Sequence, residues 1–188
     1  MMNDLKPLLQ IVEKIPVEFW PFIALFSFLI FATWWGKKRH LLCKLKAGQQ
    51  IKRLKKIKKP EYQLTHLRSI NPFVFEEMIL TAIKAQGHSI TRNKKYTGDG
   101  GIDGRCNING IDYLVQAKRY KAHINPAHVE EFAQICRKQG KKGLFVHTGK
   151  TGAKSKTIAQ KTKIEMISGQ RLLNLLMNKP KNSPENLI

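Results

Sequence analysis

The stretch from Gly98 to Tyr120 reads Gly-Asp-Gly-Gly-Ile-Asp-Gly-Arg-Cys-Asn-Ile-Asn-Gly-Ile-Asp-Tyr-Leu-Val-Gln-Ala-Lys-Arg-Tyr, and the predicted fold depends on it. Asn109-Gly110, flanked by alternating apolar residues, is the strongest local signal for a β-hairpin with a two-residue turn. Such a turn fixes the register of both strands. One surface of the hairpin is then apolar and must face a core; it is formed by the pairs Ile108–Ile111, Cys106–Tyr113, Gly104–Val115 and Ile102–Ala117.

The opposite surface of the predicted hairpin is polar. Directly opposed side chains have Cβ atoms about 5 Å apart, and diagonal neighbours are about 7–8 Å apart. A carboxylate, an amide oxygen and an ammonium group are therefore expected to converge on one small patch. A bulge at the turn would slip the register and separate them. The residues of this surface are the pairs Asn107–Asp112, Arg105–Leu114 and Asp103–Gln116, followed by Lys118.

The trio Asp103, Gln116 and Lys118 suits metal-assisted hydrolysis of a phosphodiester. Carboxylate and amide oxygens are ligands that Mg²⁺ accepts. A metal-bound water is a nucleophile at neutral pH, and the metal stabilises charge on a phosphoryl oxygen. A neighbouring lysine can orient the attacking water or neutralise the phosphate in the transition state. Taken alone, however, such a pattern is common by chance, and polar residues that alternate on a strand usually just face water.

Two motifs carry a family resemblance. Gly-Asp-Gly-Gly-Ile-Asp-Gly followed by Val-Gln-Ala-Lys-Arg-Tyr resembles the Mrr-like restriction endonucleases, a branch of the PD-(D/E)xK nuclease superfamily. The resemblance extends from about Asn71 to Leu176. It implies a restriction-endonuclease-like α/β fold, in which a mixed sheet is flanked by helices, and it implies that Mg²⁺ or Mn²⁺ is the cofactor.

The resemblance also assigns roles to individual residues. Asp103 corresponds to the first aspartate of the superfamily motif, and Lys118 corresponds to its lysine. Gln116 stands where the superfamily has an acidic residue, a replacement usual in the Mrr-like branch that leaves one fewer negative charge on the metal. The pattern Phe75-Glu76 also matches, which implies that Glu76 helps to bind the metal. The catalytic set is thus Asp103, Gln116, Lys118 and Glu76, with all of these except the lysine as metal ligands.

A helix is expected between Asn71, a plausible N-cap followed by proline, and Gly87, a stop signal. Its buried stripe is predicted to comprise Phe75, Met78, Ile79, Ala82 and Ile83. On a helical wheel Glu77 lies almost opposite this stripe, so we expect its side chain to be exposed to solvent. Glu76 lies nearer the stripe and can reach the edge of the core.

The rest of this region alternates strands and helices. We expect a strand over residues 88–95, a helix that begins at Asn125-Pro126 and ends by Gly140, and a strand over residues 143–147. A basic helix over residues 150–163, a strand over residues 164–167 and a helix over residues 169–177 follow. This order implies crossover connections and a mixed sheet that is covered on both faces.

The charge of the chain restricts the class of partner. The chain has 34 Lys and Arg against 13 Asp and Glu, a formal net charge of +21, which implies a polyanionic partner, either nucleic acid or an acidic membrane surface. Cys43, Cys106 and Cys136 are widely spaced and odd in number, so neither a disulfide framework nor a zinc site is indicated. Around the expected site we predict DNA-backbone contacts from Lys94, Lys95, Arg105, Arg119 and Lys121.

Residues 19–35 contain no charged side chain. As a helix they would rise about 26 Å, slightly less than the hydrocarbon core of a bilayer. Trp20 at one end and Trp34-Trp35 at the other match the aromatic belts of a membrane span. A signal peptide and a buried core helix are the alternatives; no basic region precedes the run, and tryptophan at both ends argues against a core helix.

Residues 37–60 carry 11 Lys or Arg. By the positive-inside rule this flank stays in the cytoplasm, which places the C-terminal part inside the cell at the inner membrane. Apolar residues at near-helical spacing, from Leu41 to Ile57, predict an amphipathic helix that Pro60 ends. Residues 37–59 could bind anionic lipid, grip phosphates or serve as a solvated linker. Residues 61–70 are interpreted as a connector.

These patterns predict five segments: residues 1–18, a transmembrane helix over 19–36, a basic juxtamembrane helix and linker over 37–70, a nuclease domain over 71–177 and a flexible tail over 178–188. The predicted function is that of a membrane-anchored, metal-dependent endonuclease of duplex DNA. Two alternatives are a structure-specific junction nuclease on the same fold and a catalytically inactive, membrane-tethered DNA-binding protein. The sequence leaves the oligomeric state open, a dimer included. No Walker-type phosphate loop occurs, so we expect no ATP requirement.

Overall fold

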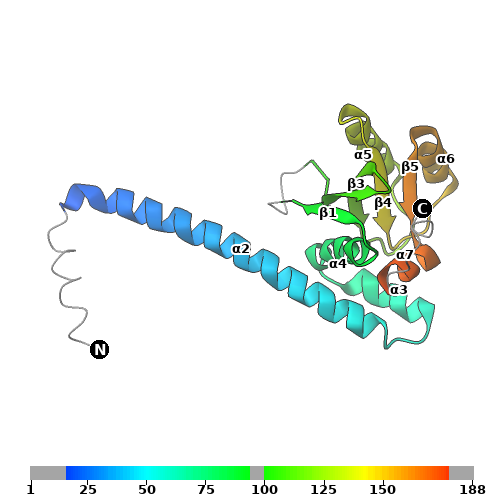
Figure 1. The fold of residues 1–188 in the computed structure, drawn as a ribbon, viewed down its shortest axis with the longest axis horizontal. Helices are drawn as coiled ribbons and strands as arrows, with labels where there is room; N and C mark the ends of the chain where they lie inside the picture. Colours follow the sequence, from blue (N-terminus) through cyan, green and yellow to red (C-terminus); the bar gives the residue numbers. More distant parts are fainter. Residues whose placement is uncertain (1–15, 94–99, 178–188) are drawn as a thin grey trace. The chain divides into compact units, whose positions relative to one another are not determined.

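The computed structural model describes residues 16–93 and 100–177. The expected tail over 178–188 and most of the first segment lie outside these residues. The chain separates into two compact units, Met1–Leu41 and Leu42–Ile188. The second unit is built on one five-stranded sheet in the order β1-β2-β3-β4-β5 (Figure 1).

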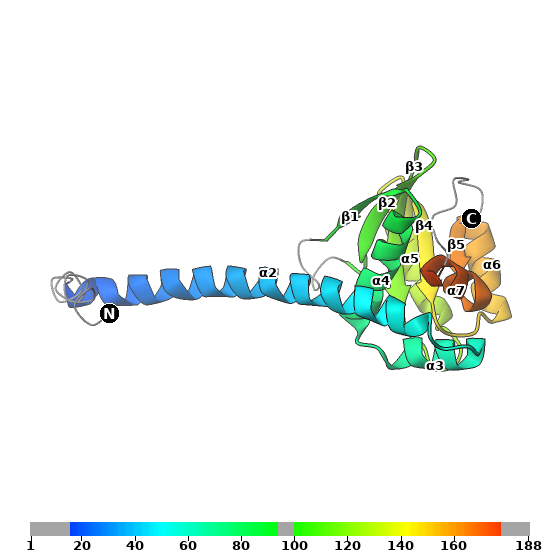
Figure 2. The same cartoon turned by 60° about the horizontal axis from the view of Figure 1, so that its bottom comes forward.

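The sheet is mixed, as the sequence predicts. Strands β1, β2 and β3 pair antiparallel, whereas β3, β4 and β5 pair parallel. Helices α4 and α7 lie on one face and α5 and α6 on the other (Figures 1 and 2). The elements are η2 (Val17–Phe19), α2 (Trp20–Leu54), α3 (Pro60–Ser69), α4 (Pro72–Ala85), β1 (Ser89–Arg92), β2 (Gly104–Ile108), β3 (Ile111–Lys118), α5 (Pro126–Lys138), β4 (Lys142–His147), α6 (Ala153–Thr162), β5 (Ile164–Ile167) and α7 (Gly169–Met177).

The predicted hairpin is present, with β2 and β3 as its strands. Both turn residues have positive φ, 53° at Asn109 and 82° at Gly110, as a type I′ turn requires. The Asn107 amide donates to Asp112 Oδ1 at 2.8 Å and braces the turn. The expected register is confirmed for the pairs Ile108–Ile111, Asn107–Asp112, Cys106–Tyr113, Arg105–Leu114 and Gly104–Val115.

The regular ladder ends at Gly104. Gly104 pairs with Val115, and the N–H of Asp103 also donates to the carbonyl oxygen of Val115, at 2.8 Å. Two residues therefore oppose one, which is the arrangement of a β-bulge. The expected pairing of Ile102 with Ala117 on one apolar surface is wrong, because the bulge moves Ile102 into the core on the opposite face of the sheet.

The sheet separates two hydrophobic cores. The core under α5 and α6 contains Leu114, Phe132 and Phe145. The larger core, on the other face, is formed by α4, α7, the hairpin and the end of α2. Within it Gly104 lies against α4: a Cβ at this position would be 2.8 Å from Leu80 Cδ2 and 3.1 Å from the Thr91 carbonyl oxygen. Only glycine allows α4 to pack this closely on the sheet.

Helices α4 and α5 begin as predicted. Asn71 Oδ1 accepts from the N–H of Phe73 at 3.0 Å, and Asn125 Oδ1 accepts from the N–H of Ala127 at 3.0 Å, each with proline at the first helical position. Helix α4 differs from the prediction in its burial. It is covered by strands on one side and by residues of α2, α3 and α7 on the other. A single buried stripe therefore underestimates how much of α4 is buried.

Helix α2 is continuous over the expected membrane span and the expected basic helix. Residues 17–54 form the one helix of the described residues that is long and apolar enough to cross a bilayer, and its most apolar window is not buried in protein. The aromatic and aliphatic side chains between Phe19 and Trp35 are exposed. The first compact unit thus contains a helix of the length and composition that a membrane span requires.

The basic part of α2 packs differently from the prediction. Leu41 and Leu45 are 58% and 57% exposed, whereas Cys43, Ala47 and Leu54 are buried in the main core. The buried residues recur at helical spacing, and the stripe includes the small side chains of Cys43 and Ala47.

Residues 61–70 are not the expected connector. Residues 61–69 belong to α3 (Pro60–Ser69), and Ile70 is its C-cap. Proline is favoured at this first helical position because its missing N–H would have no partner there. Pro60, which we expected to end the basic helix, is therefore the first residue of α3. Leu67 of α3 is fully buried in the main core, so this segment contributes to the compact unit.

The packing of α2 gives a test on one helix. We expect Leu54→Ala to lower the free energy of unfolding by about 2–5 kcal/mol, because it opens a cavity at a fully buried site. The matched change Leu45→Ala, on the exposed side of the same helix, should change it by less than about 0.5 kcal/mol. Denaturant unfolding of the detergent-solubilised full chain measures both. Equal effects of the two changes would contradict the burial of this part of α2.

Candidate active site

Asp103 lies at the bulge that precedes β2. Its Oδ2 atom accepts a hydrogen bond from the backbone N–H of Ala117 at 2.6 Å. Ala117 is the residue of β3 between Gln116 and Lys118. The expected direct pairing of Asp103 with Gln116 is therefore replaced by a contact to the backbone of the next residue, and the carboxylate lies beside the segment of β3 that carries both other predicted side chains.

Gln116 is almost completely buried, with 4% of its surface exposed. Its Nε2 atom donates to the carbonyl oxygen of Gly101 at 2.5 Å. Its Oε1 atom is buried and has no hydrogen-bond partner in the described residues. A buried, unpaired amide oxygen costs free energy. This oxygen is thus suited to accept a ligand that the protein atoms do not supply.

Gly101 makes this arrangement of Gln116 feasible. Its φ is +82°, and a Cβ at this position would be 2.9 Å from Gln116 Nε2. Any other residue would be strained and would displace the amide. Gly101 thus has a packing role: its missing side chain leaves room for the amide of Gln116.

Lys118 is the last residue of β3 and is half-buried. Because alternate residues of a strand share a face, Lys118 lies on the same face as Gln116. The structure therefore places the Asp103 carboxylate on the N–H of Ala117. Gln116 and Lys118 are the two neighbours of Ala117 on β3.

The donor set fits a hard divalent cation. Among the described residues no three His, Cys, Asp or Glu side chains form a cluster that could hold a metal ion, so a site with three such ligands, as zinc often uses, is not indicated there. A carboxylate and an unpaired amide oxygen are instead ligands that Mg²⁺ or Mn²⁺ accepts while it keeps several waters. The unpaired oxygen of Gln116 is the observation that agrees with a bound cation.

Glu76 lies on α4, which packs against β1 and β3. Its side chain is half-buried, as the prediction of a position at the edge of the core requires. Its role as a metal ligand stays a prediction from the resemblance.

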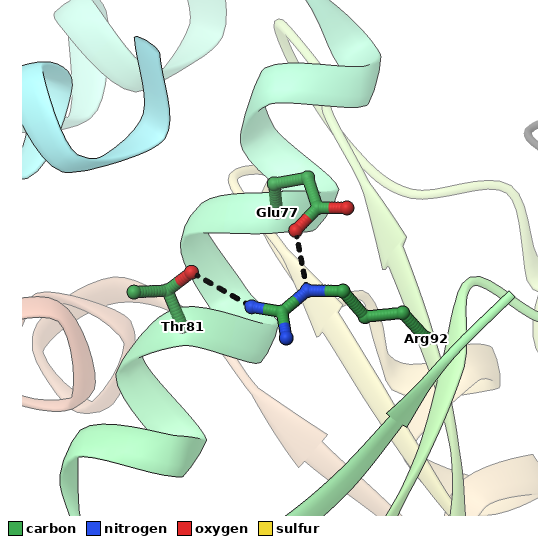
Figure 3. Close-up of polar contacts among 3 residues, drawn as sticks. All are labelled: Glu77, Thr81 and Arg92. Carbon is green, nitrogen blue, oxygen red and sulfur yellow. Dashed lines mark hydrogen bonds and ion pairs between the residues drawn. The ribbon is translucent and has the colours of Figure 1, made fainter. Parts of the chain in front are cut away.

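Glu77, the neighbour of Glu76, is where the sequence analysis was wrong. We expected its side chain to be exposed, but it is 2% exposed. Its Oε2 accepts from Arg92 Nε at 2.7 Å, and Arg92 Nη2 donates to Thr81 Oγ1 at 3.2 Å (Figure 3). The arginine, from the end of β1, covers the carboxylate and compensates its charge. The pair therefore ties α4 to the strand that leads into the glycine-rich segment.

Asn93 follows Arg92 and holds the other side of this segment. Its Nδ2 atom donates to the carbonyl oxygen of Ile102, directly before Asp103. The two ends of the segment between β1 and the bulge are therefore joined at its base. Neither Asn93 nor the Glu77–Arg92 pair was predicted, because their partners are 9 and 15 residues away and no local pattern links them.

The predicted DNA-contacting residues are found in different surroundings. Lys94 and Lys95 lie outside the described residues. Lys121 is exposed and Arg105 is half-buried on β2. Arg119 Nη1 donates to the carbonyl oxygen of Arg68 at 2.9 Å, and its Nε is buried without a hydrogen-bond partner among the described residues. Arg119 thus contacts the end of α3, and its contact with DNA stays a prediction.

His147 pairs with Lys118 in the sheet and is fully buried. Its Nε2 lies 3.2 Å from Thr151 Oγ1, and its Nδ1 has no hydrogen-bond partner in the described residues. Burial lowers the pKa of His147 to about 4, so the ring is neutral at pH 7. The histidine is therefore a poor proton donor there.

The cysteine thiols are equally unsuited to catalysis. Burial raises the pKa of Cys106 to about 12 and that of Cys136 to about 11. Since the thiolate is the nucleophilic form, both side chains are inert at neutral pH. The chemistry available at this site is thus that of oxygen ligands and an ammonium group.

The mixed five-stranded sheet flanked by helices is of the restriction-endonuclease-like type. The sequence model of the Mrr-type restriction endonuclease family matches residues 67–176. This match covers more than half of the chain, and the chain therefore belongs to that family. No curated protein matches the chain.

Solved structures show distant likeness. The MspJI restriction endonuclease in complex with a 27-mer oligonucleotide is 20% identical, with a TM-score of 0.42, over 54% of this chain and 26% of that one. Restriction endonuclease FokI is 16% identical, with a TM-score of 0.43, over 70% and 29%. SfsA of Pyrococcus furiosus, in complex with Ca²⁺, is 15% identical, with a TM-score of 0.36, over 50% and 54%. The chain thus corresponds to only about a quarter to a half of each of these proteins.

The Glu77–Arg92 pair gives a stability test. We expect Glu77→Gln to lower the free energy of unfolding by about 1–3 kcal/mol, because the change leaves Arg92 without its buried partner. A double-mutant cycle with Arg92→Met isolates the interaction. The control Glu131→Gln, on the exposed side of α5, should have little effect. Additive effects of the two changes would show that the pair does not stabilise the fold.

The low pKa of His147 makes stability depend on pH. Between pH 6.5, the ordinary value, and about pH 4, the unfolded chain binds a proton that the folded chain does not, so stability falls as the pH is lowered. The full shift corresponds to about 3 kcal/mol. Thermal unfolding from pH 7 to pH 4 should therefore show a shallower loss for His147→Asn than for the unchanged protein. Parallel pH profiles would contradict the buried neutral ring.

Proposed function

We propose that the chain is a membrane-anchored, metal-dependent endonuclease that hydrolyses phosphodiester bonds in duplex DNA. One observation carries this proposal: the Asp103 carboxylate is bonded to the N–H of Ala117, between Gln116 with its unpaired oxygen and Lys118. Membership of the restriction endonuclease family supports DNA as the substrate.

Asp103, Gln116 and Glu76 would hold Mg²⁺ or Mn²⁺. Such a cation, when bound, supplies an activated water and stabilises negative charge on the phosphoryl group. The chain itself contributes the position of the ligands. The Ala117 N–H fixes the carboxylate of Asp103, and the Gly101 carbonyl fixes the amide of Gln116, so that Oε1 faces away from Nε2 and its partner.

Lys118 would neutralise charge on the phosphate that is attacked. Its backbone is held on the β4 side, where Lys118 pairs with His147 and its carbonyl oxygen accepts from the N–H of Thr148 at 3.3 Å. A fixed ammonium group is worth more than a mobile one, since no reorganisation is needed during the reaction. Arg105 and Lys121, with Lys94 and Lys95, would contact the DNA backbone, which positions the substrate without reading its sequence.

The membrane anchor is α2, whose apolar half has the length of a span and tryptophan at both ends. Lys38 lies over the Trp34 ring, with its Nζ 4.7 Å from the centroid, an arrangement suited to the headgroup region. We infer that the basic flank, residues 37–59, lies on the cytoplasmic side of the inner membrane, where it would meet anionic lipid. The nuclease domain, residues 71–177, is then in the cytoplasm.

Nicking of supercoiled DNA by the detergent-solubilised full chain tests the proposal. We expect cleavage with Mg²⁺ or Mn²⁺ and none with EDTA. Asp103→Asn should reduce the rate at least about a hundredfold, because the metal loses a charged ligand. Asp112→Asn is the matched control: this carboxylate lies at the exposed end of the same hairpin and should be dispensable. Gln116→Met, which removes the amide oxygen and the donor to the Gly101 carbonyl, should raise the Mg²⁺ concentration needed for half-maximal rate.

The outcomes separate the alternatives. Binding of DNA that survives Asp103→Asn while cleavage is lost supports catalysis at this site. Binding without cleavage by the unchanged protein would instead favour a membrane-tethered DNA-binding protein. A preference for branched over linear duplexes would favour a junction nuclease.

A further inference from the structure

A basic groove runs along β5, the edge strand of the sheet. It has a volume of about 720 Å³. Strands β4 and β5, helix α6 and the start of α7 form its walls. The side chains that determine its character are Tyr113, Lys142, Lys156, Lys163, Glu165 and Arg171.

The charge of this groove is positive and largely uncompensated. Its acidic residue, Glu165, accepts from Arg171 at 2.6 Å, so these two charges offset each other. Lys142, Lys156 and Lys163 are exposed, and the structure pairs none of them with a carboxylate in the described residues. Three ammonium groups are thus available to a ligand.

The neighbouring sequence keeps acidic groups away. From residue 132 to residue 164 the chain contains nine Lys or Arg and no Asp or Glu. On α6 and its C-cap, Lys156, Gln160 and Lys163 are spaced four and three apart, so they lie on one side of the helix. Ammonium and amide donors therefore alternate along one wall, with the hydroxyl groups of Thr151 and Ser168 also lining the groove.

The groove reaches from a point distant from Asp103 toward the strand pair that carries Lys118. Lys142, its residue on β4, lies five residues from His147, the partner of Lys118. At about 3.3 Å per residue along a parallel strand, this is a separation of about 16 Å. Thr151, another lining residue, lies 3.2 Å from the ring of His147.

We propose that this groove binds the phosphodiester backbone of DNA, as a second contact for the substrate. Several free ammonium groups with amide and hydroxyl donors match phosphate oxygens and carry no sequence information. A second copy of the chain is disfavoured, because equal grooves would repel each other. Apolar side chains, Ile164 and Met166 among them, also line the groove, so the test below includes binding to an anionic bilayer as an outcome that would overturn the proposal. The proposal deepens the proposed function, but its test does not depend on cleavage.

The test is DNA affinity of the full chain in detergent, measured by fluorescence anisotropy on a 30-bp duplex in EDTA. Lys142→Glu, Lys156→Glu and Lys163→Glu combined should weaken binding at least about tenfold at 0.1 M salt. Each phosphate contact contributes about 0.9 to the slope of log affinity against log salt, so the slope should decrease by about 2.7. The corresponding triple Gln variant, which avoids repulsion of Glu165, should show the same direction with a smaller loss.

The matched control reverses three charges away from the groove: Lys84→Glu, Arg137→Glu and Lys138→Glu, all at exposed positions of α4 and α5. It should weaken binding far less. Equal losses in both triple variants would show a general effect of net charge and would overturn the proposal, as would unchanged affinity in folded groove variants. Loss of binding to vesicles rich in phosphatidylserine, with DNA binding intact, would overturn it in favour of lipid. If the unchanged protein does not nick DNA but the groove variants still lose DNA affinity, the proposed nuclease function is contradicted and the proposed DNA-binding groove is supported.

Discussion

The hydrogen bond from the Ala117 N–H to the Asp103 carboxylate is the contact on which the candidate site depends. It exists because the antiparallel ladder between β2 and β3 ends at Gly104, the residue that follows Asp103. In a regular ladder this N–H would bond to a backbone carbonyl of the partner strand. The bulge removes that partner, and the aspartate side chain takes its place. A backbone donor thereby holds a charged group at the point where Gln116 and Lys118 leave the neighbouring strand.

Polar contacts on both sides of this point support it. The amide of Gln116 reaches the Gly101 carbonyl, and Asn93 reaches the carbonyl of Ile102. The Glu77–Arg92 pair connects β1, from which this segment starts, to α4. A site made of few ligands thus has a surrounding set of contacts that determine its geometry. Such support is what a reaction with little tolerance for displaced groups requires.

The sequence was informative where structure is determined locally. The turn at Asn109-Gly110 and the two Asn-Pro helix starts depend on neighbouring residues, and the hairpin register follows from the turn. The sequence was misleading where distant partners decide. Glu77 is buried only because an arginine from another element covers it, and a helical wheel for one helix contains no such information.

The same limit explains the errors in the N-terminal half. The expected apolar stripe of α2 gave weight to large residues such as Leu41, yet the helix packs through Cys43 and Ala47. For the site, the identities of Asp103 and Gln116 could be inferred from their pattern. The bulge that positions them could not, since a side chain replaces a backbone acceptor there.

The glycine at position 104 has a consequence for the spacing of the whole domain. Because a methyl group there would collide with Leu80, the missing side chain sets how near α4 sits to the sheet. Glu76 is carried by that helix, and Asp103 is the residue next to this glycine. The missing side chain at position 104 therefore affects how far Glu76, on α4, lies from Asp103, which precedes this glycine.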